Sequence, residues 1–254
     1  VPAGAVWIDL GAGSCAKAAS LFGAMRPAAY VPVDISAAYL TQALAPLRRE
    51  HPGLPMLGIG LDFSGGLALP ADAVCWLAAQ RLQAAPRCVF YPGSSIGNFA
   101  PEEALRLLRE SHAVCREGGA GSGLLIGVDR VKAREVLEPA YDDALGVTAA
   151  FNRNLLLHVN RQLGSDFDPA AWDHVAFYNR IESRIEMHLS ARSPQTVSWP
   201  GGSRRFAAGE RIHTEHSYKW EPAAFADLLQ RAGFATPLHW TDARGWFSVF
   251  WAPA

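Results

Sequence analysis

Five short runs of hydrophobic residues lie in the first half of the chain, and stretches with helical periodicity separate them. Apolar runs of this length, bounded by turn residues, predict buried strands. Strands that alternate with helices pack as a parallel sheet that is covered on both faces. The predicted strands are 6–10, 30–33, 55–61, 87–91 and 123–128, and the clearest predicted helices are 15–25 and 37–49.

The pattern changes after Asp129. Residues 133–183 show helical patterns and no strand among them, which predicts a helical insertion. Polar and apolar residues then alternate, which predicts antiparallel strands at 184–190, 195–199 and 211–220, a helix at 222–232 and a closing hairpin from 238–240 and 246–251. We therefore expect a Rossmann-like core at 1–132, an inserted substrate-binding subdomain at 133–212, and a return to the core at 213–254.

Composition narrows the possible partners. Of 254 residues, 50% are hydrophobic and 19% are charged, and the net charge of −1 gives no broad field for binding nucleic acid. The cysteines (Cys15, Cys75, Cys88, Cys115) lie far apart, so we expect reduced thiols and no metal site. No apolar stretch reaches the roughly 18 residues that span a bilayer. We expect a cytoplasmic monomer that binds neither nucleic acid nor membrane.

A glycine turn follows the first predicted strand. Gly11 and Gly13 let the backbone approach a nucleotide closely, and the count from Gly11 to Ala16 also fits a dinucleotide fingerprint, so NAD is an alternative. Asp9 favours S-adenosylmethionine (SAM), because a carboxylate there repels a pyrophosphate and attracts the ammonium group of SAM. The closing antiparallel hairpin favours it too, since such a hairpin is the usual edge of class I methyltransferases.

Two further aspartates follow predicted strands. Asp34 is placed to accept hydrogen bonds from both ribose hydroxyls, and Asp62 is placed to accept one from the adenine amine. The ring of Phe63 can pack on the base. Each aspartate alone could also be a helix N-cap. Together with Asp9 they predict a nucleoside site where the strands end.

A second group of polar residues suits a small amino-acid substrate. Asn98, in the loop after the fourth strand, offers a donor and an acceptor, although the loop is also typical turn chemistry. Alternation puts Glu215 and Ser217 on one face of a strand and His216 on the other, so the first two can hold the nitrogens of an imidazole ring, with Ser217 as donor or acceptor. The alternative is a solvated strand face.

These motifs together resemble one enzyme family over essentially the whole chain. They are Asp9 to Gly13 with Lys17, Val33-Asp34, Asp62-Phe63, 93–98, 141–143, 146–148 with Phe151-Asn152, 184–187 and 214–217. In this order they resemble the histidine N-alpha-methyltransferases of ergothioneine biosynthesis. The resemblance implies SAM-dependent trimethylation of the α-amino group of L-histidine, giving hercynine. It also implies a class I methyltransferase sheet with a mostly helical insertion and added antiparallel strands.

The resemblance assigns roles to individual residues. The SAM-binding positions are Gly11, Lys17, Asp34, Asp62 and Phe63, to which the glycine turn adds Asp9 and Gly13. Gly93, Asn98 and Tyr141 would hold the amino-acid backbone, and Asn98 and Tyr141 are the expected catalytic residues. Glu215 and Ser217 would bind the imidazole, with His216 between them and Met187 lining the pocket.

Three alternatives stay open at this point. Family members carry a helical segment before the first strand whose tyrosines help to close the histidine pocket, and the chain here begins at that strand. Without that segment it could bind SAM yet methylate poorly, or act as a non-catalytic SAM-binding module. An NAD-dependent oxidoreductase is the second alternative. A methyltransferase for a related amino acid is the third, because one change at Met187 or Glu215 could retune the pocket.

Overall fold

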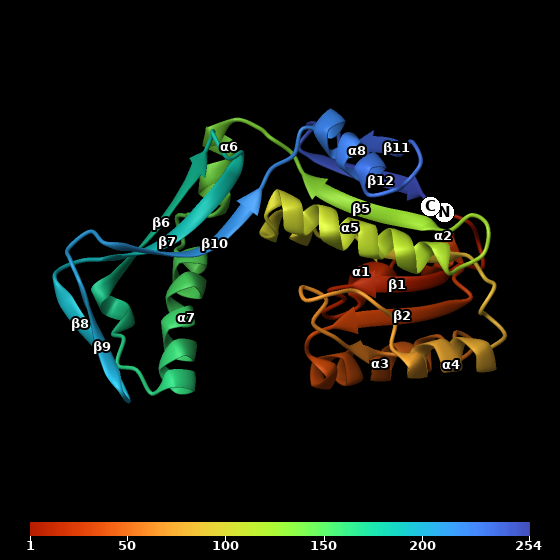
Figure 1. The fold of residues 1–254 in the computed structure, drawn as a ribbon, viewed down its shortest axis with the longest axis horizontal. Coiled ribbons are helices and arrows are strands. Elements are labelled where there is room, and N and C mark those ends of the chain that lie inside the picture. Colours follow the sequence, from red (N-terminus) through yellow and green to blue (C-terminus); the bar gives the residue numbers. More distant parts are fainter. The chain divides into compact units, whose positions relative to one another are not determined.

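The computed structural model describes all 254 residues and divides into two compact units. The first unit is Val1–Arg130 with Trp220–Ala254, and the second is Val131–Lys219 (Figure 1). The chain returns to the first unit at Trp220 rather than at residue 213, because strand β10 (Arg211–Tyr218) pairs along its length with β7 (Arg184–Ala191) of the second unit.

A seven-stranded sheet forms the centre of the first unit, in the order β11-β12-β5-β4-β1-β2-β3. Its strands are β1 (Val6–Leu10), β2 (Ala29–Asp34), β3 (Ile59–Gly60), β4 (Arg87–Tyr91), β5 (Gly123–Asp129), β11 (Leu238–Thr241) and β12 (Phe247–Pro253). All pairs are parallel except those of β12, which runs antiparallel to β5 and β11. The parallel sheet and the closing hairpin confirm the expectation from the sequence.

The helices of the first unit follow the predicted pattern, and one helix and one strand differ locally from it. They are α1 (Ala16–Ala19), α2 (Phe22–Met25), α3 (Ala37–Glu50), α4 (Ala71–Ala79), the 3-10 helix η1 (Ser95–Asn98), α5 (Pro101–Arg116) and α8 (Pro222–Arg231). The single helix expected at 15–25 is interrupted where the Ser20 hydroxyl donates to the Lys17 carbonyl, which competes with helix continuation. The third strand is shorter than predicted: it comprises Ile59–Gly60, and Met56 adds only an isolated bridge to Tyr30.

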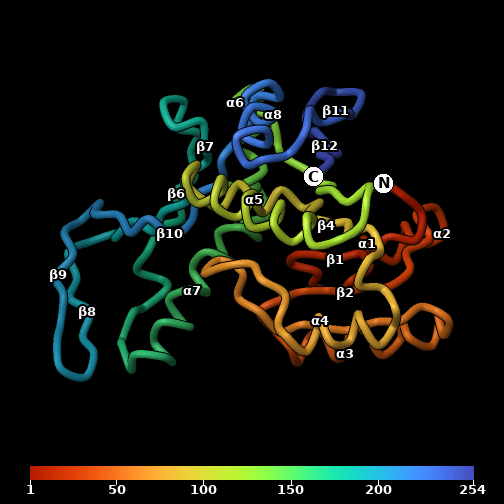
Figure 2. Tube along the Cα trace, turned by 45° about the vertical axis from the view of Figure 1, so that its right-hand side comes forward, coloured from red at the N-terminus to blue at the C-terminus, as the bar shows by residue number.

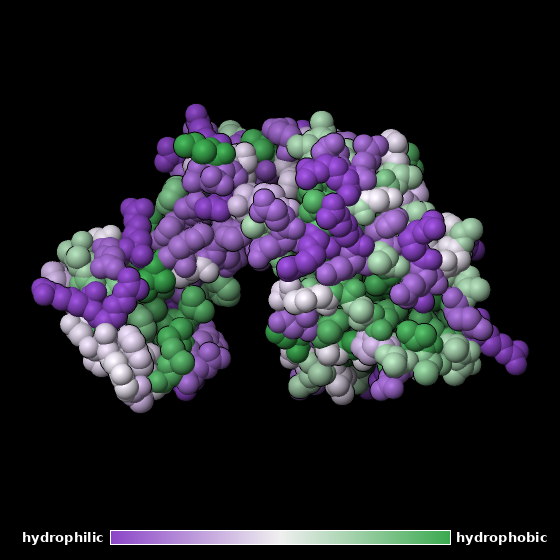
Figure 3. Space-filling view, viewed as in Figure 1, coloured by the Kyte–Doolittle hydropathy of each residue, from purple (hydrophilic) through white to green (hydrophobic).

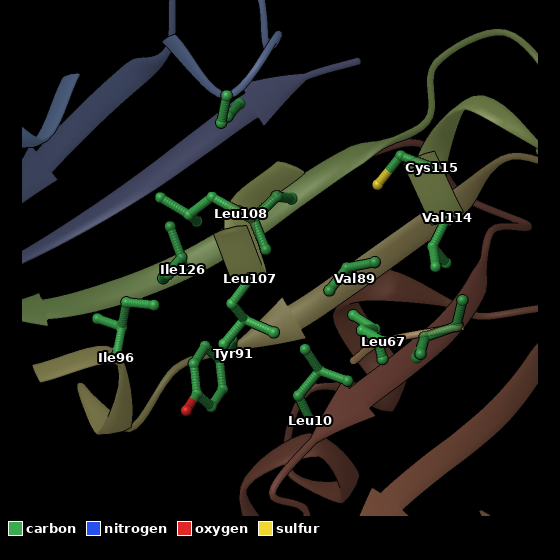
Figure 4. Close-up of a cluster of buried hydrophobic side chains, with 14 of the residues drawn as sticks. Leu10, Leu67, Val89, Tyr91, Ile96, Leu107, Leu108, Val114, Cys115 and Ile126 are labelled. Carbon is green, nitrogen blue, oxygen red and sulfur yellow. The ribbon is translucent and has the colours of Figure 1, made fainter. Parts of the chain in front are cut away.

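Alternate residues of the central strands feed two separate hydrophobic clusters. Val6, Ile8 and Leu10 belong to the cluster that includes Leu108 of α5, whereas Trp7 belongs to the cluster that includes α3. These four apolar residues of β1 are at most 2% exposed. Figure 4 shows the first cluster, in which side chains from the strands meet those of α5. A strand that is buried on both faces needs a continuous apolar run, which explains why these strands were predictable.

The second unit contains helices and antiparallel strands. Its elements are α6 (Arg134–Leu137), the 3-10 helices η2 (Glu138–Ala140) and η3 (Pro169–Ala171), α7 (Val147–Leu163), β6 (Trp172–Asn179), β7, β8 (Gln195–Trp199), β9 (Gly202–Phe206) and β10. Strands β10, β7 and β6 form one sheet, and β8 pairs with β9 in a hairpin (Figure 2). No helix in the chain combines the length and apolar character needed to cross a membrane.

The expectation of an insertion without strands between 133 and 183 is wrong, because β6 lies there. It pairs with β7 over eight positions, from Trp172↔Ala191 to Asn179↔Arg184. Only Trp172 is fully buried, and the other seven residues are half-buried or exposed on both faces. A strand of this kind has no clear polar-apolar alternation, so its pattern does not distinguish it from a helix.

Candidate functional site

A cavity of about 260 Å³ opens at the carboxyl ends of the central strands of the first unit. Its position is the switch point of the sheet, where β1 has β2 on one side and β4 on the other, and ligands of open α/β sheets bind at such points. The lining residues are Gly11, Asp34, Ile35, Leu61, Asp62, Phe63, Ser64, Tyr91, Ser95, Asn98 and Phe99. The cavity therefore gathers four of the predicted cofactor residues and Asn98.

The glycine turn forms one wall of this cavity. Gly11 and Gly13 have φ angles of 64° and 52°, in the left-handed region that glycine adopts without strain. A Cβ on Gly11 would lie 3.9 Å from the rings of Phe63 and Tyr91. A side chain at Gly11 would thus fill space beside two aromatic residues of the lining, which supports close approach of a ligand to this backbone.

The two strand-terminal aspartates are held by backbone N–H groups. Gly13 N donates to Asp34 Oδ2 at 3.0 Å, and Ser36 N donates to Oδ1 at 3.1 Å. Asp62 Oδ1 accepts from both the backbone N–H and the hydroxyl of Ser64, and these bonds lower the pKa of Asp62. A carboxylate has about four acceptor positions, so each fixed Asp34 oxygen can still accept a ligand hydroxyl.

Apolar surface in this cavity includes residues that the sequence analysis did not single out. Ile35 is 72% exposed although it is a large aliphatic residue, and the ring of Tyr91 stands edge-on to Phe63 at 5.9 Å between centroids. An isoleucine directly after the aspartate that ends a predicted strand is a signal that sequence reading could have used. These side chains can enclose the planar base of a nucleoside.

Asp9, Gly13, Lys17 and Gly93 do not line the cavity. Asp9 is 4% exposed and accepts a hydrogen bond of 2.6 Å from the Tyr30 hydroxyl. Burial raises the pKa of Asp9 to about 7, against the opposing effects of Tyr30 and Lys17. Lys17 lies next to Gly93, because a Cβ built on that glycine would be 3.8 Å from the ammonium nitrogen.

In the second unit, a β-bulge orients the expected substrate residues. The register between β10 and β7 shifts between His213 and Glu215, so Glu215 lies opposite Met187 and Ser217 opposite Ile185. Residues two apart on a strand share a face, so Glu215 and Ser217 point the same way, as their spacing predicted. The Thr214 hydroxyl donates to the Met187 carbonyl at 3.0 Å, which stabilises the bulge.

Glu215 lines a cavity of about 210 Å³ beside α7. Its other lining residues are Phe151, Asn152, Asn154, Leu155, His158 and Thr214. Burial raises the pKa of Glu215, and the charge of Lys219 opposes this shift. Phe151 and Leu155 are exposed apolar residues four positions apart on α7. Figure 3 shows apolar surface over this part of the second unit. The cavity thus combines a partly desolvated carboxylate with apolar walls.

Tyr141, Ser217 and Lys219 form a closed hydrogen-bonded triad. The Tyr141 hydroxyl lies 3.0 Å from Ser217 Oγ, and the Lys219 ammonium donates to Tyr141 Oη at 2.7 Å and to Ser217 Oγ at 2.8 Å. Met187, 3% exposed, packs in the cluster that includes Tyr141. Sequence reading missed Lys219, although residues 215, 217 and 219 alternate onto the same side of the chain.

A buried relay fixes the backbone of Tyr141. The Tyr141 carbonyl can only accept, so His174 Nε2 donates to it at 2.8 Å. His174 Nδ1 therefore accepts from Asn152 Nδ2, at 2.9 Å, and Asn152 is 3% exposed. His216 takes no part in either group, because its ring lies on the opposite face of β10, 5.7 Å from that of His213. The structure therefore does not bring His216 together with Glu215 and Ser217.

Comparison with known proteins agrees with this geometry. The chain is 38% identical over 252 residues to a histidine N-alpha-methyltransferase of Mycolicibacterium smegmatis and 35% identical to that of Mycobacterium tuberculosis, with 95% of this chain and 73% of each relative covered. The crystal structure of the CcbJ methyltransferase from Streptomyces caelestis matches with a TM-score of 0.54 and 14% identity, over all of this chain and 84% of that one.

The sheet order and the antiparallel β12 are those of class I methyltransferases, as the structural likeness shows. The likeness shows the fold alone, and the family match decides between the two cofactors that the glycine turn left open, in favour of SAM. The model of a family described as "Histidine-specific methyltransferase, SAM-dependent" matches residues 2–254. The chain therefore belongs to the family of SAM-dependent, histidine-specific methyltransferases.

Proposed function

We propose that this protein transfers methyl groups from SAM to the α-amino group of L-histidine, up to the trimethylated betaine hercynine, in ergothioneine biosynthesis. The observation that carries the proposal is the pair of Glu215 and Ser217 on one face of β10, next to Tyr141 and Met187. A carboxylate and a hydroxyl at this spacing match the two nitrogens of an imidazole ring. Membership of the family supports the same substrate.

The cavity of the first unit fits SAM. Asp34 would bind the ribose hydroxyls, Asp62 the adenine amine, and Phe63 the base, beside a glycine turn that leaves room for a ligand. Lys17 and Asp9 would hold the carboxylate and ammonium of its amino-acid part, Asp9 from its buried position beside the turn. When bound, SAM supplies an electrophilic methyl group on a sulfonium ion.

The remaining residues would bind and orient histidine. Gly93, Asn98 and Tyr141 would hold its amino-acid part, and Glu215 with Ser217 would hold its ring. The attacking α-amine must be neutral, and with a pKa of about 8 a fraction is neutral near pH 7 without a strong base. Positioning the amine is therefore the main task of these side chains.

We expect the affinity for SAM to rise with pH through about 7. Asp9 has a pKa of about 7, so its carboxyl group is mostly neutral below that pH and mostly ionised above it. Only the ionised form attracts the SAM ammonium. Calorimetry between pH 6 and 8 should show this increase in the native chain and a flat profile in Asp9→Asn. An equal rise of SAM affinity with pH in the two proteins would show that Asp9 does not bind SAM.

Mass spectrometry of histidine incubated with SAM and the protein tests the proposed reaction. We expect products that carry one, two and three added methyl groups, all of them on the α-nitrogen. Phenylalanine and tryptophan serve as control substrates, because neither side chain has two ring nitrogens that could hydrogen-bond to both Glu215 and Ser217. Methylation of either in preference to histidine would refute the proposed substrate.

The cytoplasmic location, the monomeric state and the lack of nucleic-acid binding remain predictions from composition. Light scattering after gel filtration, with and without histidine and SAM, would test the monomer.

A further inference from the structure

Lys219 is a buried cation in contact with two residues of the proposed histidine site. Lys219 is 3% exposed, and its ammonium group donates hydrogen bonds to Ser217 Oγ and to Tyr141 Oη. The same nitrogen lies 4.7 Å from the centroid of the Tyr141 ring. A buried lysine is uncommon, and this one directs its charge at the polar atoms of the site.

The hydrogen bonds at Ser217 fix the direction of its hydroxyl group. A serine oxygen has two acceptor lone pairs and one hydrogen. Lys219 can only donate, so it occupies one lone pair. Tyr141 Oη already accepts from Lys219, and its phenolic hydrogen is a good donor, so Tyr141 occupies the second. With both lone pairs occupied in this way, the Ser217 hydrogen points away from Lys219 and Tyr141.

We infer that Lys219 is a positioning residue that makes Ser217 a hydrogen-bond donor to the substrate ring. The inference rests on the proposed function. Glu215 accepts, and Ser217 donates, so the pair binds a ring that has one N–H and one bare nitrogen. The site then selects the neutral imidazole in a single tautomer. The imidazolium ion is disfavoured, because its second N–H would face the Ser217 hydrogen and the charge of Lys219.

Several titratable groups face this part of the unit. They are Glu215 and Lys219 at β10, Tyr141 after η2, His158 on α7, and His174 and Tyr178 on β6. Protonation of Glu215 would weaken histidine binding at low pH in the same direction as protonation of the ring. A variant that changes only the residues bonded to Ser217 leaves Glu215 in place. It therefore separates protonation of the ring from protonation of Glu215.

Calorimetric titration of L-histidine into protein saturated with S-adenosylhomocysteine, at pH 5.5 and 7.5, tests the inference. With an imidazole pKa near 6.5, the native chain should bind about tenfold more tightly at pH 7.5. Tyr141→Phe and Lys219→Met each free one lone pair of Ser217, which can then accept from the imidazolium ion. The expected change between the two pH values falls to roughly threefold or less in both.

Arg180→Met is the matched control for loss of a cation in the same unit, because Arg180 is exposed in the turn between β6 and β7. It should keep the native pH profile. Variants that fold but weaken binding by the same factor at both pH values would show a merely structural role and overturn the inference. If Lys219→Met does not fold, Lys219→Leu is measured in its place, because Tyr141→Phe tests only the other bond to Ser217. A native chain that does not bind histidine at pH 7.5 would instead refute the proposed function.

Discussion

Asp34→Ala is expected to bind SAM at least about 100-fold more weakly than the native chain, because hydrogen bonds to a charged group contribute roughly 1.5 to 3 kcal/mol each and two are lost. Both oxygens of Asp34 are already oriented by the backbone N–H groups of Gly13 and Ser36. A pre-oriented acceptor loses little entropy when the ribose binds. Calorimetry with SAM measures the effect directly.

Asp34 also holds the glycine turn, so a control must separate binding from folding. Asp242→Ala removes a carboxylate that accepts from the backbone N–H groups of Arg244, Trp246 and Phe247 in the β11–β12 hairpin, away from the cavity lining. It should lower thermal stability without changing the affinity for SAM. Asp34→Asn, which keeps one acceptor oxygen, should fall between the native chain and Asp34→Ala. Unchanged SAM affinity in Asp34→Ala would exclude Asp34 from the ribose site.

Glu215→Ala is expected to weaken histidine binding by roughly 1 to 3 kcal/mol, since the ring N–H loses its acceptor in a partly buried site. The affinity for SAM should not change, because Glu215 belongs to the second unit and the SAM cavity to the first. Glu215→Gln keeps a carbonyl acceptor and should show a smaller loss. Glu182→Gln, at an exposed glutamate in the turn before β7, is the control and should bind histidine normally.

Glu215→Ala and Glu215→Gln should not lower the thermal stability of the protein at neutral pH. Burial raises the pKa of Glu215, so the folded state holds a proton more strongly than the unfolded state. The free energy of unfolding therefore falls as the pH rises from the ordinary value of the group through its raised value. Removing the carboxyl group removes this cost. Stability that decreases in Glu215→Gln at pH 7.5 would show that the carboxylate stabilises the fold rather than serving the substrate.

The apolar runs of the sequence were sufficient to predict the core of the first unit. Strands such as β1 are buried on both faces, and only continuous hydrophobic residues satisfy that environment. The positions of Gly11, Asp34 and Asp62 were predictable from these strands, because Gly11 follows β1, Asp34 ends β2 and Asp62 lies two residues after β3. The strand β6 was not predictable, since half-buried residues on both faces leave no alternation to read.

The sequence by itself determined the buried strands, the glycine turn with its aspartates, and the shared face of Glu215 and Ser217, because neighbours along the chain set all of these locally. Only the tertiary structure decided that Tyr30 takes the carboxylate of Asp9, and that Lys219 and Tyr141 converge on Ser217. Tyr141 and Lys219 are 78 residues apart in the chain. Contacts at that separation depend on how strands and helices pack, which no local pattern of residues encodes.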